Sequence, residues 1–246
     1  MDWQNESHRI GIVGGLILAT LTLASGIAVY AVMQRQTESI LVRSLEASLQ
    51  NDRRLFESEI TASLTDALAV SPRPYVIHNL QRLQAAPGDN ASRQALQQVA
   101  DSFLPTGFAG VAFYDARNNE VVRAGRLSKS PALSVPLNTQ AGARLMWDGH
   151  LILQLVREVR DESGIRIGMA RAESALPQLT RTIADAGALG KTAELAVCAP
   201  REQDMQCFPA VQSQRVFPRI ARTIDGRPLP MSYALDGKTG TWIVPD

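Results

Sequence analysis

The feature that most constrains the fold is an unbroken apolar stretch close to the N-terminus, from Ile10 to Met33, in which Tyr30 is the only ionisable residue. A helix needs about 20 consecutive apolar residues to cross a bilayer, so this stretch is long enough. A cleaved signal peptide is the alternative, but its apolar part is usually only about 7–15 residues and ends at a small-residue cleavage site, which is poor here. The sequence therefore predicts a cytoplasmic stub at residues 1–9 and an uncleaved transmembrane helix at residues 10–33.

The orientation of this helix does not follow from the charges that flank it. Arg9 lies on one side, and Arg35 and Arg43 lie on the other, so the positive-inside rule does not decide. Cys198 and Cys207 are the only two cysteines, and they flank a polar segment typical of a hairpin loop. Disulfides form in oxidising compartments, where two close cysteines can bond; two unpaired thiols are the alternative. We expect a disulfide, and hence a main domain on the outer side of the membrane.

Composition argues for a folded domain and against nucleic-acid binding. Among the 246 residues, 45% are hydrophobic and 20% are charged, which is ordinary for a globular protein. The formal net charge is +1, and the sequence has no cluster of lysine or arginine. Binding to phosphate backbones requires concentrated positive charge, so DNA and RNA are excluded as expected partners.

The segment after the apolar stretch, residues 34–71, has the pattern of a long amphipathic helix. Pro72 and Pro74 end it, because proline lacks the amide hydrogen that a helix needs. We expect this helix to pack along its own domain, to link that domain mechanically to the membrane, and to form a homodimer. The apolar positions recur at multiples of three to four residues: Leu41, Leu45, Leu49, Phe56, Ile60, Leu64 and Leu68.

The rest of the chain predicts an α+β fold with an antiparallel sheet. Short helices are expected at Val76–Ala86 and Ser92–Leu104, and a longer one at Ser174–Ala188, with Pro177 in its first turn. A hairpin, a meander and a further strand are expected from alternating apolar residues and turn residues. These strands are Phe108–Ala116 with Glu120–Ala124, then Ala143–Trp147, His150–Arg160 and Ile165–Ala172, and finally Ala193–Ala199.

Three segments of the sequence resemble the extracytoplasmic double Cache sensors, whose PAS-like modules follow a long N-terminal helix. They are GVAFYDARNNEVVRAG (110–125), GALGKTAELAV (187–197) and ALDGKTGTWIVPD (234–246). The resemblance implies a first Cache module at residues 72–188 and part of a second at residues 189–246. Such sensors return to a second membrane span and are fused to histidine kinase, diguanylate cyclase, phosphodiesterase or chemotaxis output domains. The sequence stops at Asp246, before such a span, so the resemblance implies a truncated receptor in a bacterial inner membrane, with its main domain periplasmic.

Arg157 is the main candidate for a ligand contact. It interrupts an apolar strand face, and a charge on a core-facing side is costly unless it is paired. An anionic ligand is one partner; a protein acid, or solvent reached from the strand end, is the alternative. Three residues on neighbouring strands are candidates for the same pocket, with ordinary core packing as the alternative: Tyr114, Arg123 and Trp147.

No pattern in the sequence predicts catalysis, a metal site or a cofactor. The three histidines lack the spacing of metal ligands, and the common hydrolase and metalloprotease motifs are missing. We expect the ligand-sensing input region of a signal-transduction receptor, binding a small organic acid, an amino acid or another small molecule. The alternative is a membrane-anchored periplasmic scaffold or envelope-assembly protein that does not sense a ligand.

Overall fold

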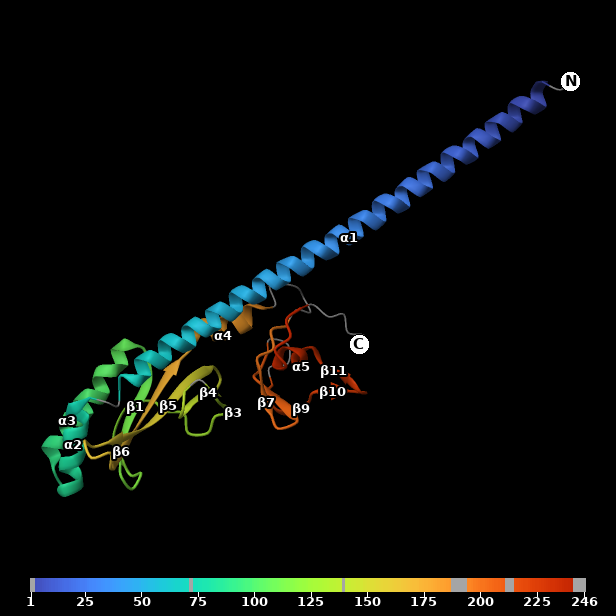
Figure 1. Ribbon diagram of the computed structural model, residues 1–246. Helices are drawn as coiled ribbons and strands as arrows, with labels where there is room; N and C mark the ends of the chain where they lie inside the picture. Colours follow the sequence, from blue (N-terminus) through green and yellow to red (C-terminus); the bar gives the residue numbers. More distant parts are fainter. Residues whose placement is uncertain (1–2, 71–72, 139, 187–193, 211–214, 241–246) are drawn as a thin grey trace. The chain divides into compact units, whose positions relative to one another are not determined.

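The computed structural model describes residues 3–70, 73–138, 140–186, 194–210 and 215–240, with side chains from residue 15 onward (Figure 1). The chain divides into two compact units, Met1–Asn51 and Asp52–Asp246. Helices and antiparallel sheets make up the structure, which confirms the predicted mixed fold class.

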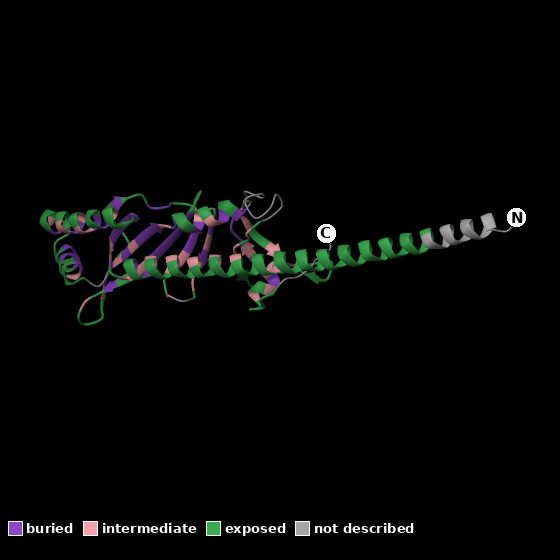
Figure 2. Cartoon of the chain, turned by 90° about the horizontal axis from the view of Figure 1, so that it is seen from above, coloured by how far each residue is buried: buried purple, intermediate pink, exposed green. Residues whose placement is uncertain are grey.

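The first unit consists of the N-terminal part of helix α1 (Trp3–Leu68). Within the described residues, one helix is long and apolar enough to cross a membrane, and none of its apolar window is buried by protein. Figure 2 shows α1 as exposed over residues 15–41. Exposed apolar surface of this extent is stable in lipid and unfavourable in water, so the helix fits the predicted span. Its exposed large side chains include Leu16, Ile17, Leu18, Leu21, Leu23, Ile27, Val29, Val32 and Met33.

The last turns of α1 belong to the second unit and are partly buried there. Leu64 and Ala67 join the core cluster, and Phe56 and Ile60 pack against it. Two helices follow, α2 (Pro74–Ala85) and α3 (Asn90–Phe103), and then the short 3-10 helix η1 (Leu104–Thr106). Asp89 caps α3: its carboxylate accepts a hydrogen bond from the backbone N–H of Ser92 (3.1 Å), which lowers the pKa of Asp89.

A six-stranded antiparallel sheet in the order β2-β1-β6-β5-β4-β3 forms the centre of the second unit. The predicted hairpin and meander are both present, and strand β6 joins them by pairing with β1. The short edge strand β3 was not predicted. The strands are β1 (Phe108–Asp115), β2 (Glu120–Gly125), β3 (Leu133–Pro136), β4 (Ala143–Trp147), β5 (Leu151–Arg160) and β6 (Arg166–Ala175).

The predicted helix at Ser174–Ala188 begins too early. Ser174 is still in the sheet, where it pairs with Phe108 and Leu153, and helix α4 runs from Pro177 to Asp185. Proline suits the first position of a helix, because that residue has no intrahelical partner for its N–H. The predicted end of this helix lies outside the described residues.

One face of the sheet packs against the helices, and Figure 2 shows its strands as buried. Directly paired residues on antiparallel strands point to the same face. Phe113, Ala170 and Arg157 form such a row, as do Val111, Ala172 and Leu155. Apart from Arg157, these residues belong to the same core cluster as the buried residues of α1, α2 and α3.

Helix α4 is capped by a residue of α1. Its N-cap position, Leu176, offers no side-chain acceptor. Instead the Glu59 carboxylate accepts hydrogen bonds from the backbone N–H groups of Gln178 (3.2 Å) and Leu179 (2.9 Å). A negative charge at a helix N-terminus is favourable, because the first N–H groups of the helix point toward it. Glu59 therefore connects α1 to the segment that directly follows β6.

We expect Glu59→Ala to lower the free energy of unfolding by about 1 kcal/mol, the usual cost of losing an N-terminal cap. Urea unfolding of the full chain in detergent micelles measures this change. The matched control is Glu57→Ala. Glu57 lies two residues before Glu59 on the same helix, and its substitution removes only an exposed ion pair with Arg53. That pair contributes about 0.2–0.5 kcal/mol, so equal losses in the two variants would contradict a capping role.

The C-terminal part contains a three-stranded sheet of β7 (Cys198–Arg201), β8 (Asp204–Cys207) and β9 (Phe217–Ala221). Strands β10 (Thr223–Ile224) and β11 (Arg227–Pro228) pair with each other and precede helix α5 (Pro230–Leu235). The predicted strand at Ala193–Ala199 begins late: residues 194–197 are not strand, and residue 193 lies outside the described residues.

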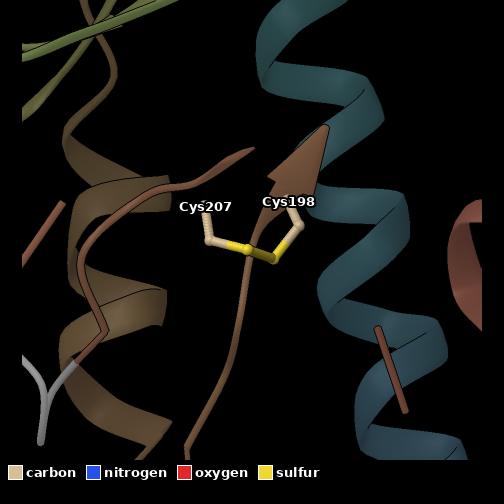
Figure 3. The surroundings of a disulfide bond; sticks show 2 residues. All are labelled: Cys198 and Cys207. Atoms are coloured by element: carbon tan, nitrogen blue, oxygen red, sulfur yellow. A yellow bond between two sulfur atoms is a disulfide. The ribbon is translucent and has the colours of Figure 1, made fainter. Parts of the chain in front are cut away.

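Cys198 and Cys207 form the predicted disulfide bond (Figure 3). They are directly paired across the β7–β8 hairpin, and their Cα atoms are 4.0 Å apart. The assignment of residues 189–246 to a partial second Cache module stays a prediction. Parts of the segments that suggested it, residues 187–193 and 241–246, lie outside the described residues.

Candidate ligand-binding groove

The four side chains predicted to share a pocket lie on two different faces of the sheet. Trp147 pairs with Leu151 on the core-facing side, and Arg157 is on that side too, paired with Ala170. Leu151 and Arg157 are about 20 Å apart along β5, at about 3.3 Å per residue, which separates Trp147 from Arg157. Tyr114 and Arg123 lie on the opposite face, since each neighbours a core-facing residue on its own strand.

Arg157 itself lies near the end of β5, where it is partly exposed. Within the part of the chain that the structure describes, its guanidinium has no hydrogen-bond or ion-pair partner. Arg157 is also not among the residues that line the groove described next. A ligand contact for Arg157 stays a prediction, and the sheet offers a better candidate site on its other face.

The candidate site is an open groove of about 960 Å³ on the sheet face opposite the helices. One wall is the segment Arg126–Ser130, which connects β2 to β3 and which we call the strap. Of the four predicted residues, Arg123 lines the groove. The lining residues are Leu104, Phe108, Ala109, Arg123, Gly125, the strap, Asp148, His150, Ile152 and Glu173.

The strap lies close against β1 because two glycines allow it. Gly125 has φ +69°, a left-handed conformation that turns the chain out of β2. The next residue, Arg126, donates its backbone N–H to the Ala109 carbonyl (2.8 Å). A Cβ atom at Gly110 would lie only 2.5 Å from the Arg126 carbonyl oxygen. Any larger residue at position 110 would therefore push the strap away from the sheet.

A buried carboxylate holds the middle of the strap. Glu173 on β6 is 1% exposed, and its Oε2 accepts a hydrogen bond from the backbone N–H of Ser128 (2.7 Å). Its Oε1 accepts from Gln154 Nε2 (2.8 Å) and from Arg171 Nε (3.0 Å). Arg171 Nη2 also donates to the Ser128 carbonyl (2.5 Å). The main chain of Ser128 is thus bound on both sides, and the charge of Glu173 is compensated by Arg171.

Other polar groups of the groove are left without partners. Ser128 is 8% exposed, and within the described residues its Oγ atom has no hydrogen-bond partner. Arg126 and Lys129 have no ion-pair or side-chain hydrogen-bond partner in that same part of the chain. Arg123, in contrast, is paired with Glu120, and this hydrogen bond raises the pKa of the Arg123 guanidinium.

Sequence reasoning did not identify Glu173, Arg171, Gln154 or Ser128. A signal was present, since Arg171 and Glu173 alternate with apolar residues along one strand. The predicted strand ended at Ala172, however, and the expected helix began at Ser174, so Glu173 was assigned to neither element. Ser128 takes part mainly through main-chain atoms, and main-chain contacts cannot be recognised from the residue type.

Comparison of the chain with family models, with curated proteins and with solved structures gives no match. The resemblance to Cache sensors therefore stays a hypothesis that rests on the quoted segments. Within the described residues, no group of three or more His, Cys, Asp or Glu side chains is placed to hold a metal ion.

Proposed function

We propose that this chain is the extracytoplasmic ligand-sensing input region of a membrane signal-transduction receptor, with a PAS-like module of the Cache type. The observation that carries the proposal is the groove, whose wall is held in place by a fully buried Glu173. The apolar part of α1 supports attachment to a membrane. The disulfide supports an oxidising compartment for the domain.

The groove favours ligand sensing over a purely structural role. Small-molecule sites usually occupy about 300–1,000 Å³ and combine apolar walls with a few well-placed polar groups. This groove has that size and that mixture, with Leu104, Phe108 and Ile152 beside Ser128 and Arg126. Burying charged groups is costly even when they are paired. A buried charged network beneath a groove wall is therefore better explained as support for a binding site than as ordinary core packing.

The extracytoplasmic placement has a direct test in reporter fusions after Gly88, which lies in the exposed turn between α2 and α3. We expect an alkaline phosphatase fusion to be active and a cytoplasmic reporter at the same point to be inactive. The reverse result would overturn the placement of the domain outside the cytoplasm.

We expect ligand binding to the full chain in nanodiscs to raise its melting temperature. A ligand at a hundred times its Kd contributes about 2.7 kcal/mol, so a screen of organic acids, amino acids, polyamines and neutral metabolites is sensitive enough. Ser130→Trp, which fills the groove, should abolish the shift; Ser163→Trp, in the exposed β5–β6 loop, should keep it. No shift with any class would reject sensing in favour of a scaffold role.

A further inference from the structure

The electrostatics of the groove identify the chemical class of its ligand. Resting on the proposed sensor function, we infer that the groove binds a small organic carboxylate that carries no ammonium group. Arg126 and Lys129 pair with the carboxylate, and the Ser128 hydroxyl donates a hydrogen bond to it. Three independent features of the described residues support this inference: the unpaired charges, the unpaired hydroxyl, and the occupied acceptors of Glu173.

The unpaired charges around the groove are mainly positive. Arg123 is neutralised by Glu120, and Glu173 is neutralised by Arg171. Of the remaining lining residues, Arg126 and Lys129 are positive and Asp148 is negative, so two positive charges against one negative leave +1. A groove with a net positive charge attracts anionic ligands.

The buried hydroxyl of Ser128 lies between these two cations in the sequence. Its Oγ atom is shielded from solvent and has no partner among the described residues, although a buried hydroxyl normally has one. Ser128 is among the residues that line the groove, and we assign the hydrogen bond of its hydroxyl to an acceptor oxygen of the ligand. A hydroxyl that is not needed for holding the strap is thus available for recognition, because the strap is held by the Ser128 main chain.

The acid on the floor of the groove is not available to an ammonium group. Both oxygens of Glu173 already accept hydrogen bonds, from Gln154, Arg171 and the Ser128 main chain. Asp148 is exposed in the β4–β5 turn, where a pair with a ligand would contribute little. An amino acid would therefore bring a positive charge into a groove whose buried carboxylate already has its hydrogen bonds and its counter-ion.

Isothermal titration of the full chain in nanodiscs tests the ligand class with matched compounds. The carboxylates are lactate, phenyl-lactate and succinate; the amino acids are alanine and phenylalanine; the amines are ethylamine and phenethylamine. We expect at least one carboxylate to bind at least tenfold more tightly than its amino-acid counterpart, with an affinity that falls as salt is raised. Preference for an amino acid or an amine, or no carboxylate binding, would overturn this inference and leave the sensor proposal intact, because sensing is rejected only if the wider melting-temperature screen also finds no ligand.

The same titration tests the residues. Arg126→Gln and Lys129→Gln should each weaken carboxylate binding about tenfold, and Ser128→Ala about fivefold, as expected for charge-assisted and neutral hydrogen bonds. Arg117→Gln, an exposed arginine in the β1–β2 turn outside the groove, should leave affinity unchanged. Arg126 and Lys129 are exposed, so their variants should unfold at the wild-type urea concentration. A folded Arg126→Gln/Lys129→Gln variant with wild-type affinity would refute the assignment, as would affinity independent of salt.

Discussion

Replacing Arg171 with methionine is expected to lower the free energy of unfolding by about 3–5 kcal/mol, because it leaves the buried Glu173 without its counter-ion. Arg171 also donates to the Ser128 carbonyl, so the Ser128 main chain loses one of its two hydrogen bonds. Urea unfolding of the full chain in detergent micelles measures the loss. We expect the lower part of this range, since the Arg171 side chain is 24% exposed and water can partly replace it.

Two further variants separate the buried charge from general effects of substitution. Arg171→Met combined with Glu173→Gln removes both charges and should recover at least half of the loss, because an uncompensated carboxylate no longer lies in the core. Arg160→Met on the adjacent strand removes an exposed ion pair with Glu158 and should cost about 0–1 kcal/mol. An Arg171→Met variant as stable as Arg160→Met would show that the buried pair does not hold the strap.

Loss of the Cys198–Cys207 disulfide is expected to cost about 2–3 kcal/mol in the chain-entropy model, because it frees a closed loop in the unfolded chain. The two cysteines are 9 positions apart in the sequence. The double variant Cys198→Ala/Cys207→Ala should unfold at a lower urea concentration than the oxidised wild type. Added dithiothreitol should bring the wild type to the same midpoint and leave the variant unchanged.

Thiol labelling links this bond to the compartment of the domain. Protein from intact cells, denatured without a reductant, should take up no label, because the cytosol keeps thiols reduced and extracytoplasmic compartments do not. Two labelled cysteines would contradict both the bond and the oxidising environment. Wild-type stability that does not respond to dithiothreitol would contradict the energetic estimate alone.

Much of the fold was predictable, because the apolar residues of its helices and strands recur with the spacing typical of each. The stripe of Leu64 and Phe56 marks α1, and alternation of apolar and polar residues marks the β1–β2 hairpin. Strand β3 was missed because it is short and contains Pro136, a residue that usually indicates a loop. Proline is tolerated here because β3 is an edge strand. The end of β6 was missed because Ser174 before Pro177 resembles a helix start.

The candidate site was predicted less well, since it depends on register. A shift of one residue moves a side chain to the other face of a sheet, and no local pattern states which strands lie side by side. Arg157 was noticed because it broke an apolar pattern, yet it lies on the core face, whereas Arg123 lines the groove. The Glu173 network joins β5, β6 and the strap, which are brought together only by the insertion of β6 between β1 and β5.

The attachment of the strap through main-chain atoms has a consequence for how such a site can change over time. Every residue except proline carries the N–H and C=O groups by which Ser128 is bound, so these hydrogen bonds do not fix the identity of residue 128. The same holds for Arg126, whose N–H supplies the first anchor. The exposed side chains at positions 126, 129 and 130 can therefore be exchanged while the wall keeps its course. One scaffold can acquire a new chemical preference by substitution at these three exposed positions, without any repacking of the core beneath them.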